Sequence, residues 1–125
     1  MLRNIIRYFA FILFVISILN LSYGVVSINT CQVINESLLD GSRIVDLSSN
    51  INFNSDPSCL NIDVSNAILD CKGFSILGVS SMSGIYVGNV DNVTVRNCDL
   101  VNANFLAQTP TNSFFYNLNF TNTLN

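Results

Sequence analysis

The stretch Asn92-Val93-Thr94-Val95-Arg96-Asn97-Cys98-Asp99-Leu100-Val101-Asn102 decides how the rest of the chain is interpreted. Its apolar residues fall on alternate positions, which is typical of a β-strand with one buried face. Twenty residues on, Asn112-Ser113-Phe114-Phe115-Tyr116-Asn117-Leu118-Asn119-Phe120-Thr121-Asn122 repeats it, with Asn over Asn and apolar over apolar residues. A looser copy precedes it at residues 66–71. Short strands that return about every 20 to 27 residues, with Asn at the bends, indicate coils stacked on coils, a β-solenoid.

The ends of the 125-residue chain differ from this pattern. Residues 9–21 form an apolar block of about 13 residues, preceded by Arg3 and Arg7 and followed by Ser22-Tyr23-Gly24, which predicts a secretory signal peptide over residues 1–24. A retained membrane anchor is the alternative, although a span needs roughly 20 apolar residues. Residues 25–42 are the least regular part, and we expect a cap there with a short helix around residues 36–39. Coils follow over residues 43–125, and the last coil is incomplete.

Charge and composition exclude several classes of function. Without residues 1–24 the chain has three basic and eight acidic residues, a net charge of −5. Such an acidic domain has no electrostatic basis for binding nucleic acid or an anionic membrane surface, so the only membrane contact we expect is through the signal or anchor. The chain has no His, which excludes Ser/His/Asp and Cys/His nucleophilic sites and His-ligated zinc. We expect no metal and no cofactor.

Four cysteines in an exported chain favour disulfides, and four allow three connectivities. Cys71 and Cys98 occupy equivalent places in consecutive copies, where stacked coils would place their Cα atoms about 4.8 Å apart. That distance permits a disulfide but does not require one, because parallel side chains can also stack as reduced thiols. Cys31 and Cys59 would then join the cap to the first coil.

Several of these runs together resemble a known family. Residues 59–62, Asn66-Ala67-Ile68-Leu69-Asp70-Cys71-Lys72-Gly73-Phe74-Ser75-Ile76, Gly84-Ile85-Tyr86-Val87 and residues 92–98 resemble the opening of right-handed parallel β-helix surface proteins. This pectate-lyase-like group includes the NosD-like copper-associated proteins. The resemblance covers roughly residues 31–125 and implies an all-β, right-handed parallel β-helix of about three to four coils. It also implies a fragment, because such proteins usually have more coils. The copper association finds little support, since His and a Met cluster are absent.

The resemblance is poor evidence for function, because the same helix carries lyases, hydrolases, adhesins and inert surface coats. A catalytic hypothesis uses the polar residues Asp70, Lys72, Asp91, Arg96 and Asp99 as a lyase or hydrolase site on a uronic-acid polymer, with calcium as a possible ligand. The acids are scattered singly, however, and a solvated coil surface with aspartates at its turns is the better interpretation.

The surface residues offer two further hypotheses. Tyr86, Arg96 and Tyr116 are candidates for contact with carbohydrate, together with the aromatic residues Phe105 and Phe114 if these face outward. Asn66, Asn92 and Asn112 recur at one corner of successive coils, where Asn tolerates the left-handed conformation, so we expect them to form a ladder. Formal N-glycosylation sequons begin at Asn35, Asn92 and Asn119.

The sequence therefore predicts a secreted or cell-surface β-helix protein that serves as a structural or interaction module, without an evident catalytic site. A carbohydrate-binding module and a fragment of a polysaccharide lyase or hydrolase are the alternatives. The partners expected are cell-surface polysaccharide or envelope proteins.

Overall fold

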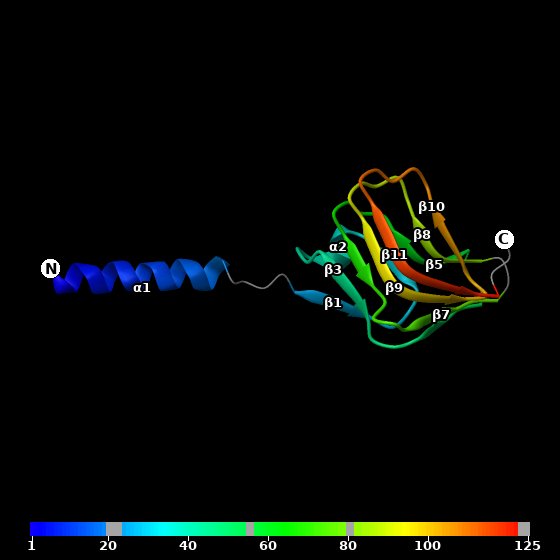
Figure 1. The fold of residues 1–125 in the computed structure, drawn as a ribbon, viewed down its shortest axis with the longest axis horizontal. Coiled ribbons are helices and arrows are strands. Elements are labelled where there is room, and N and C mark those ends of the chain that lie inside the picture. The colour runs from blue at the N-terminus through cyan, green and yellow to red at the C-terminus, as the bar shows by residue number, and fades with distance from the viewer. Residues whose placement is uncertain (20–23, 55–56, 80–81, 123–125) are drawn as a thin grey trace.

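The chain folds into a parallel β-solenoid of about 4 turns, preceded by a helix. The computed structural model describes residues 1–19, 24–54, 57–79 and 82–122. Helix α1 (Leu2–Leu19) lies apart from the β body, in which the strands are stacked side by side (Figure 1). The predicted all-β solenoid with an N-terminal helix is confirmed.

Short strands follow one another around each coil. Their bounds are β1 (Val25–Ile28), β2 (Gln32–Ile34), β3 (Ile44–Leu47), β4 (Ile51–Asn52), β5 (Ser58–Ile62), β6 (Ile68–Asp70), β7 (Ser75–Leu77), β8 (Ser83–Val87), β9 (Thr94–Val101), β10 (Asn104–Ala107) and β11 (Phe114–Thr121). Each named pair of these strands is parallel.

The strands form two sheets that run along the stack. One has the order β1-β3-β6-β9-β7-β4 with β11 also paired to β9, and the other has the order β10-β8-β5-β2. The first sheet contains two arms, because β9 is long enough to pair with β6 through its first half and with β7 through its second half. Asn97 divides the two halves in the left-handed conformation (φ 57°), so one residue makes the bend. In the preceding coil Lys72 and Gly73 make the equivalent bend.

The core is a set of apolar columns that run through the coils. Leu69, Val95 and Phe115 are in register, and so are Ile76, Leu100 and Phe120. Val93, Val95 and Leu100 are fully buried, whereas Thr94 and Arg96 are half-buried on the outer face. The predicted register is therefore confirmed, as is the alignment of Leu118 over Cys98.

Residues 25–42 are more regular than the cap that the sequence indicated. They contain β1 and β2, which pair with β3 and β5, as well as the expected short helix, α2 (Glu36–Leu39). The helix begins at Asn35, whose side chain accepts a hydrogen bond from the backbone of Leu38, and ends at Asp40 in the left-handed conformation. The segment is thus a partial coil. Its two strands were hard to recognise because each is only three or four residues long.

Two disulfides join successive coils. Cys31 is bonded to Cys59 and Cys71 to Cys98, with Cα atoms 4.5 and 4.8 Å apart. These are the two pairings favoured by the repeat spacing, so stacked reduced thiols are excluded for Cys71 and Cys98. Two disulfides suggest an oxidising, extracellular environment.

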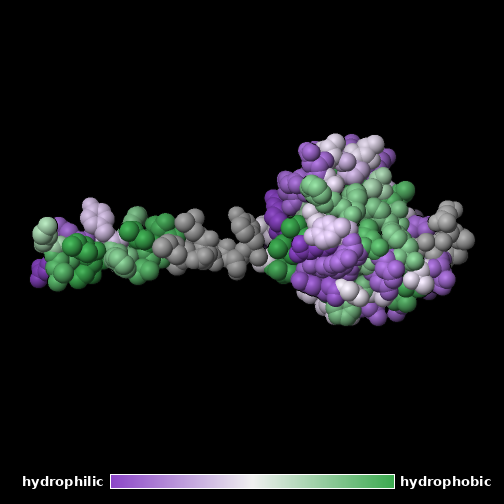
Figure 2. All heavy atoms as spheres, in the orientation of Figure 1, coloured by the Kyte–Doolittle hydropathy of each residue, from purple (hydrophilic) through white to green (hydrophobic). Residues whose placement is uncertain are grey.

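Helix α1 exposes apolar side chains between Leu2 and Phe14, as Figure 2 shows. Ser22 and Tyr23 of the expected cleavage site lie outside the described residues. Among the residues that are described, no helix is long and apolar enough to cross a membrane.

Candidate functional site

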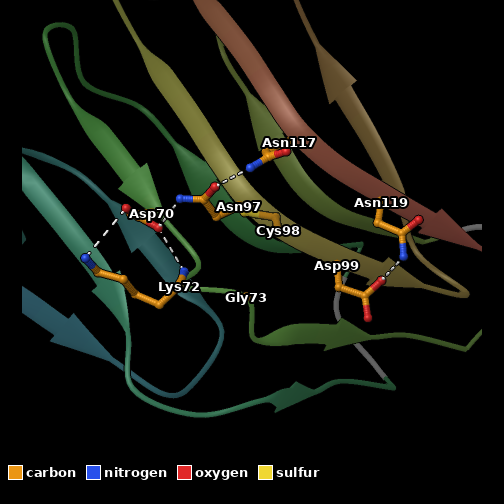
Figure 3. A pocket seen from close by; sticks show the side chains of 8 residues that line it. All are labelled: Asp70, Lys72, Gly73, Asn97, Cys98, Asp99, Asn117 and Asn119. Carbon is orange, nitrogen blue, oxygen red and sulfur yellow. Dashed lines mark hydrogen bonds and ion pairs between the residues drawn. The ribbon is translucent and has the colours of Figure 1, made fainter.

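A group of polar side chains surrounds an open groove on the outer surface, at the bend between the two arms of the first sheet. The groove has a volume of ≈ 520 Å³. Figure 3 shows the residues that line it: Asp70, Lys72, Gly73, Asn97, Cys98, Asp99, Asn117 and Asn119. They come from the end of β6 and the turn after it, from β9 and from β11, so three successive coils build the groove.

The groove exists because the bends stack. Lys72, Asn97 and Asn117 all have positive φ, between 55° and 57°. Asn is one of the few residues other than Gly that adopts this conformation readily, because its short polar side chain bonds locally. The outer face turns at the same place in these three coils, and the side chains at the turn converge.

Asp70 is the buried centre of this site, with 3% of its surface exposed. Its Oδ1 accepts hydrogen bonds from the backbone N–H of Lys72 (2.9 Å) and from Asn97 Nδ2 (3.0 Å), and its Oδ2 accepts one from Arg96 Nε (2.8 Å). Burial alone would raise the pKa of Asp70. The hydrogen bonds from Asn97, Lys72 and Arg96, with the positive charge of Lys72, outweigh burial and hold the pKa below its usual value. Asp70 is therefore a carboxylate at neutral pH.

Amide ladders continue outward from Asp70. Asn117 Nδ2 donates to Asn97 Oδ1 (2.9 Å), which extends the column begun by Asn97 and Asp70. In a parallel column, Asn119 Nδ2 donates to Asp99 Oδ1 (3.0 Å), and Asp99 Oδ2 accepts from the Ser75 hydroxyl (2.7 Å). These side chains are thus used to hold neighbouring coils together.

The expected ladder at the other corner is confirmed for its first two members. Asn66 and Asn92 have positive φ, and Asn92 Nδ2 donates to Asn66 Oδ1 (2.9 Å). Asn112 also has positive φ at the equivalent place in the next coil.

The structure brings together two of the three candidates for carbohydrate contact. Arg96 and Tyr116 are in register on adjacent strands, and Arg96 Nη1 donates to Tyr116 Oη (3.3 Å). That hydrogen bond and the one to Asp70 raise the pKa of Arg96. Tyr86 lies on the other sheet, where its hydroxyl donates to Gln108 Oε1 (2.6 Å).

The possibility that Phe105 faces outward for sugar stacking is wrong. Its ring packs edge-on against Phe115, with centroids 4.9 Å apart, beside the core. Phe105 is aligned with Ile85 of β8, which is fully buried, so its side chain lies on the inner face of the sheet. Phe114 does face solvent, with 63% of its surface exposed.

The suggested catalytic cluster is only partly assembled. Asp70, Lys72 and Arg96 are in direct contact, with Lys72 Nζ 3.7 Å from Asp70 Oδ2, and Asp99 lines the same groove. Asp91 is paired with Thr111 at the Asn66–Asn92 corner instead. Within the described residues, no group of three or more Cys, Asp or Glu side chains is arranged to hold a metal ion.

The three sequons occupy different settings. Asn35 caps α2, Asn92 belongs to the ladder with Asn66, and Asn119 belongs to the ladder with Asp99. Asn92 and Asn119 are exposed, whereas Asn35 is half-buried.

Sequence reasoning did not identify the Asp70–Asn97–Asn117 column or the partner of Tyr86. The 20-residue repeat aligns Asn117 with Asn97, and this alignment could have predicted the column. No sequence pattern predicted the Tyr86–Gln108 hydrogen bond, because Gln108 follows β10, whose register is irregular.

The stacked parallel coils define the fold class as a parallel β-helix, in which amide ladders and disulfides link successive coils. Comparisons with protein-family models, with curated sequences and with solved structures each return no match.

Proposed function

We propose that this chain is a structural or interaction module of a secreted or cell-surface β-helix protein, related to the pectate-lyase-like and NosD-like group. The observation that carries the proposal is that polar side chains of the outer surface bond to one another across coils. Asp70, Asn97, Asp99, Asn117 and Asn119 all do so. A surface organised in this way holds a stack together.

The same contacts disfavour catalysis. A general acid needs a pKa near the working pH, whereas the pKa of Asp70 is lowered and both of its oxygens accept hydrogen bonds. Both oxygens of Asp99 also accept hydrogen bonds, one from Ser75 and one from Asn119.

The proposal is tested by expressing the full chain in cells with a secretory pathway and locating the β body. We expect the β body outside the membrane, with both disulfides formed and an N-terminus near Val25. Replacing both Arg3 and Arg7 with Glu should impair export. A reduced chain in the cytosol would contradict the proposal. An exported full-length chain held in the membrane would instead show that residues 1–24 are a retained anchor and not a cleaved signal peptide.

The catalytic alternative is tested on the same material. Exported protein incubated with uronic-acid polymers and calcium should produce no rise in the absorbance of unsaturated uronates. A calcium-dependent rise would overturn the structural assignment.

Carbohydrate binding is a second candidate, favoured by the Arg96–Tyr116 pair beside the groove. A guanidinium and a phenol next to exposed amides can bond sugar hydroxyls or carboxylates. On a glycan array, we expect Tyr116→Ala to abolish binding and Tyr86→Ala, on the other sheet, to leave it unchanged. Loss of binding only with Tyr86→Ala would move the site to the second sheet, and no binding to any polysaccharide would end this hypothesis.

A further inference from the structure

The two disulfides differ in how far solvent reaches them. Cys71 and Cys98 are 0 and 2% exposed, so both residues of that bond are buried. Cys98 borders the groove of the candidate site, but its low exposure shows that the groove does not open onto the bond. In the other bond Cys59 is 2% exposed, whereas Cys31 is half-buried. Of the four cysteines, all of which the structure describes, Cys31 is therefore the one that solvent reaches.

A hollow on the surface lies at the Cys31–Cys59 bond. It has a volume of ≈ 280 Å³ and shares no lining residue with the groove of the candidate site. Both cysteines line it, together with Gln32, Val33, Pro57, Ser58 and Asn61. No carboxylate is among these lining residues, although the chain is acidic. A thiolate that approaches Cys31 through the hollow therefore meets no like charge on its walls.

The segment that this bond ties to the stack consists of two short elements. The strand β2 is three residues long and pairs with β5, and α2 follows it with four residues. The strand β1 is held separately, by its pairing with β3. Breaking the bond therefore loosens residues 32–39 and leaves β1 and the later coils in place. Ile34 and Leu39 are buried, so the segment can close again once the bond is restored.

We propose that the Cys31–Cys59 disulfide is a site of thiol–disulfide exchange, at which an external dithiol cleaves the bond and lets residues 32–39 open from β5. The buried Cys71–Cys98 bond stays intact, so the following coils keep their stack. This site goes beyond the proposed structural role, and its failure would leave that role untouched.

The exchange has two steps. A thiolate of the dithiol attacks Cys31 Sγ, a bond forms between these two sulfurs, and Cys59 leaves as a thiolate that takes a proton from water. The second thiol of the dithiol, as a thiolate, then attacks the reagent sulfur that is bound to Cys31. Cys31 leaves and is protonated, and the dithiol becomes a disulfide. Two electrons have then passed from the dithiol to the protein.

The test uses the full chain with both disulfides formed, in a mild detergent that covers α1. Dithiothreitol, a neutral dithiol, is added without denaturant, and samples are alkylated at intervals and mapped as peptides without further reduction. We expect the Cys31–Cys59 bond to be reduced about tenfold or more faster than the Cys71–Cys98 bond. With mercaptoethanol, a neutral monothiol, we expect the trapped mixed disulfide on Cys31.

Hydrogen exchange measures the opening. After selective reduction, the amides of β2 and α2 should exchange about tenfold or more faster, whereas those of β6 and β9 should not change. The double variant Cys31→Ser, Cys59→Ser is the matched control and should show the same pattern without any reagent. The double variant Cys71→Ser, Cys98→Ser should lose its remaining disulfide at the wild-type rate.

A change in the wall of the hollow tests the route of attack. Asn61→Phe places a ring beside the bond and should slow its reduction severalfold. Leu106→Phe enlarges an exposed side chain on β10, which does not line the hollow, and should leave the rate unchanged. Circular dichroism confirms that each variant is folded.

Three results would overturn the proposal. The first is reduction of both disulfides at the same rate, or of Cys71–Cys98 first, because exposure then does not control the reaction. The second is a reduced chain in which β2 and α2 stay as protected as in the oxidised chain. The third is a mixed disulfide on Cys59, or an unchanged rate in Asn61→Phe, because the attack then does not reach Cys31 through the hollow.

Discussion

Asp70 shows how a single residue links the coils. Its carboxylate is buried in β6, yet it receives hydrogen bonds from Arg96 and Asn97 of the next coil and from the backbone of Lys72 in its own. Lys72 Nζ also lies 3.5 Å from Asp46 Oδ2, in the coil before. Because Asp46 and Asp70 are in register on adjacent strands, the two cations offset the repulsion between two neighbouring carboxylates.

The first prediction concerns the pH dependence of this group. The pKa of Asp70 is lower in the folded chain than the value of about 3.9 expected unfolded, so its stabilisation is present at neutral pH and disappears as the pH falls through the folded pKa. Asp70→Asn should lower the free energy of unfolding by about 2 kcal/mol at pH 7. It should also weaken the fall of that free energy as the pH is lowered towards 2. Urea unfolding between pH 2 and pH 7 measures both effects.

The control for this prediction is Asp63→Asn, which removes the same charge from an exposed position. This control should leave the loss of stability at acid pH as it is in the wild type. A wild-type stability that does not fall below pH 4, or an equal effect of the two variants, would contradict the role given to Asp70.

The second prediction concerns Val95, which is fully buried between Leu69 and Phe115. Val95→Asp places a charge in the core without a partner and should cost more than about 3 kcal/mol. Thr94→Asp, on the outer face of the same strand, should cost much less. Thermal unfolding compares the two, and a larger loss from Thr94→Asp would show that the register is shifted by one residue.

At the scale of the elements, the bends rather than the strands set the shape of each coil. The strand β9 continues through Asn97 and still changes direction, because one residue in the left-handed conformation turns the chain. In the preceding coil, two residues with positive φ, Lys72 and Gly73, make the bend between the shorter strands β6 and β7. The Asn side chain adds a bond to each neighbouring coil, so conformation and stacking depend on the same residue.

The third prediction separates these two contributions. Asn97→Gly keeps the freedom to adopt positive φ but loses the bonds to Asp70 and Asn117, whereas Asn97→Ala loses both. We expect Asn97→Ala to be less stable than Asn97→Gly by about 1 kcal/mol. Denaturant unfolding measures the difference, and equal stabilities would mean that the backbone conformation at residue 97 carries little strain.

At the scale of the whole molecule, the first end of the stack is covered, and β11 is the last strand that the structure describes. Residues 25–42 add a partial coil and α2 over the first full coil, and Cys31–Cys59 ties this segment to β5. The Cys71–Cys98 bond joins the next two coils. The β11 end has neither a helix nor a disulfide among the described residues.

The fourth prediction concerns these disulfides. Closing loops of 28 and 27 residues is worth about 3.5 kcal/mol each by chain entropy. Replacing Cys31 and Cys59 with Ser should cost about that much, and hydrogen exchange should show β2 and α2 opening first. Replacing Cys71 and Cys98 with Ser should leave β2 and α2 protected from exchange. The coils that contain Cys71 and Cys98 are held by hydrogen bonds to a neighbouring coil on each side.

Non-reducing peptide mapping checks the pairing itself, with linked peptides expected for Cys31–Cys59 and Cys71–Cys98. A Cys31–Cys98 peptide would contradict the order of the coils.

The local repeat in the sequence was enough to predict the solenoid, its register over β9 and β11 and the Asn66–Asn92 ladder, and it permitted the disulfide pairing that the structure shows. All of these follow from a spacing of 20 to 28 residues, because stacked coils place like positions over like. Only the tertiary structure decided that residues 25–42 pair as strands, that Phe105 packs against Phe115 and that Asp70 joins Arg96 and Asn97 in one groove. Those features depend on the face that β10 turns to the core, on strands too short to show alternation and on side-chain directions at a bend. None of these leaves a periodic trace in the sequence, so the folded chain was needed to place them.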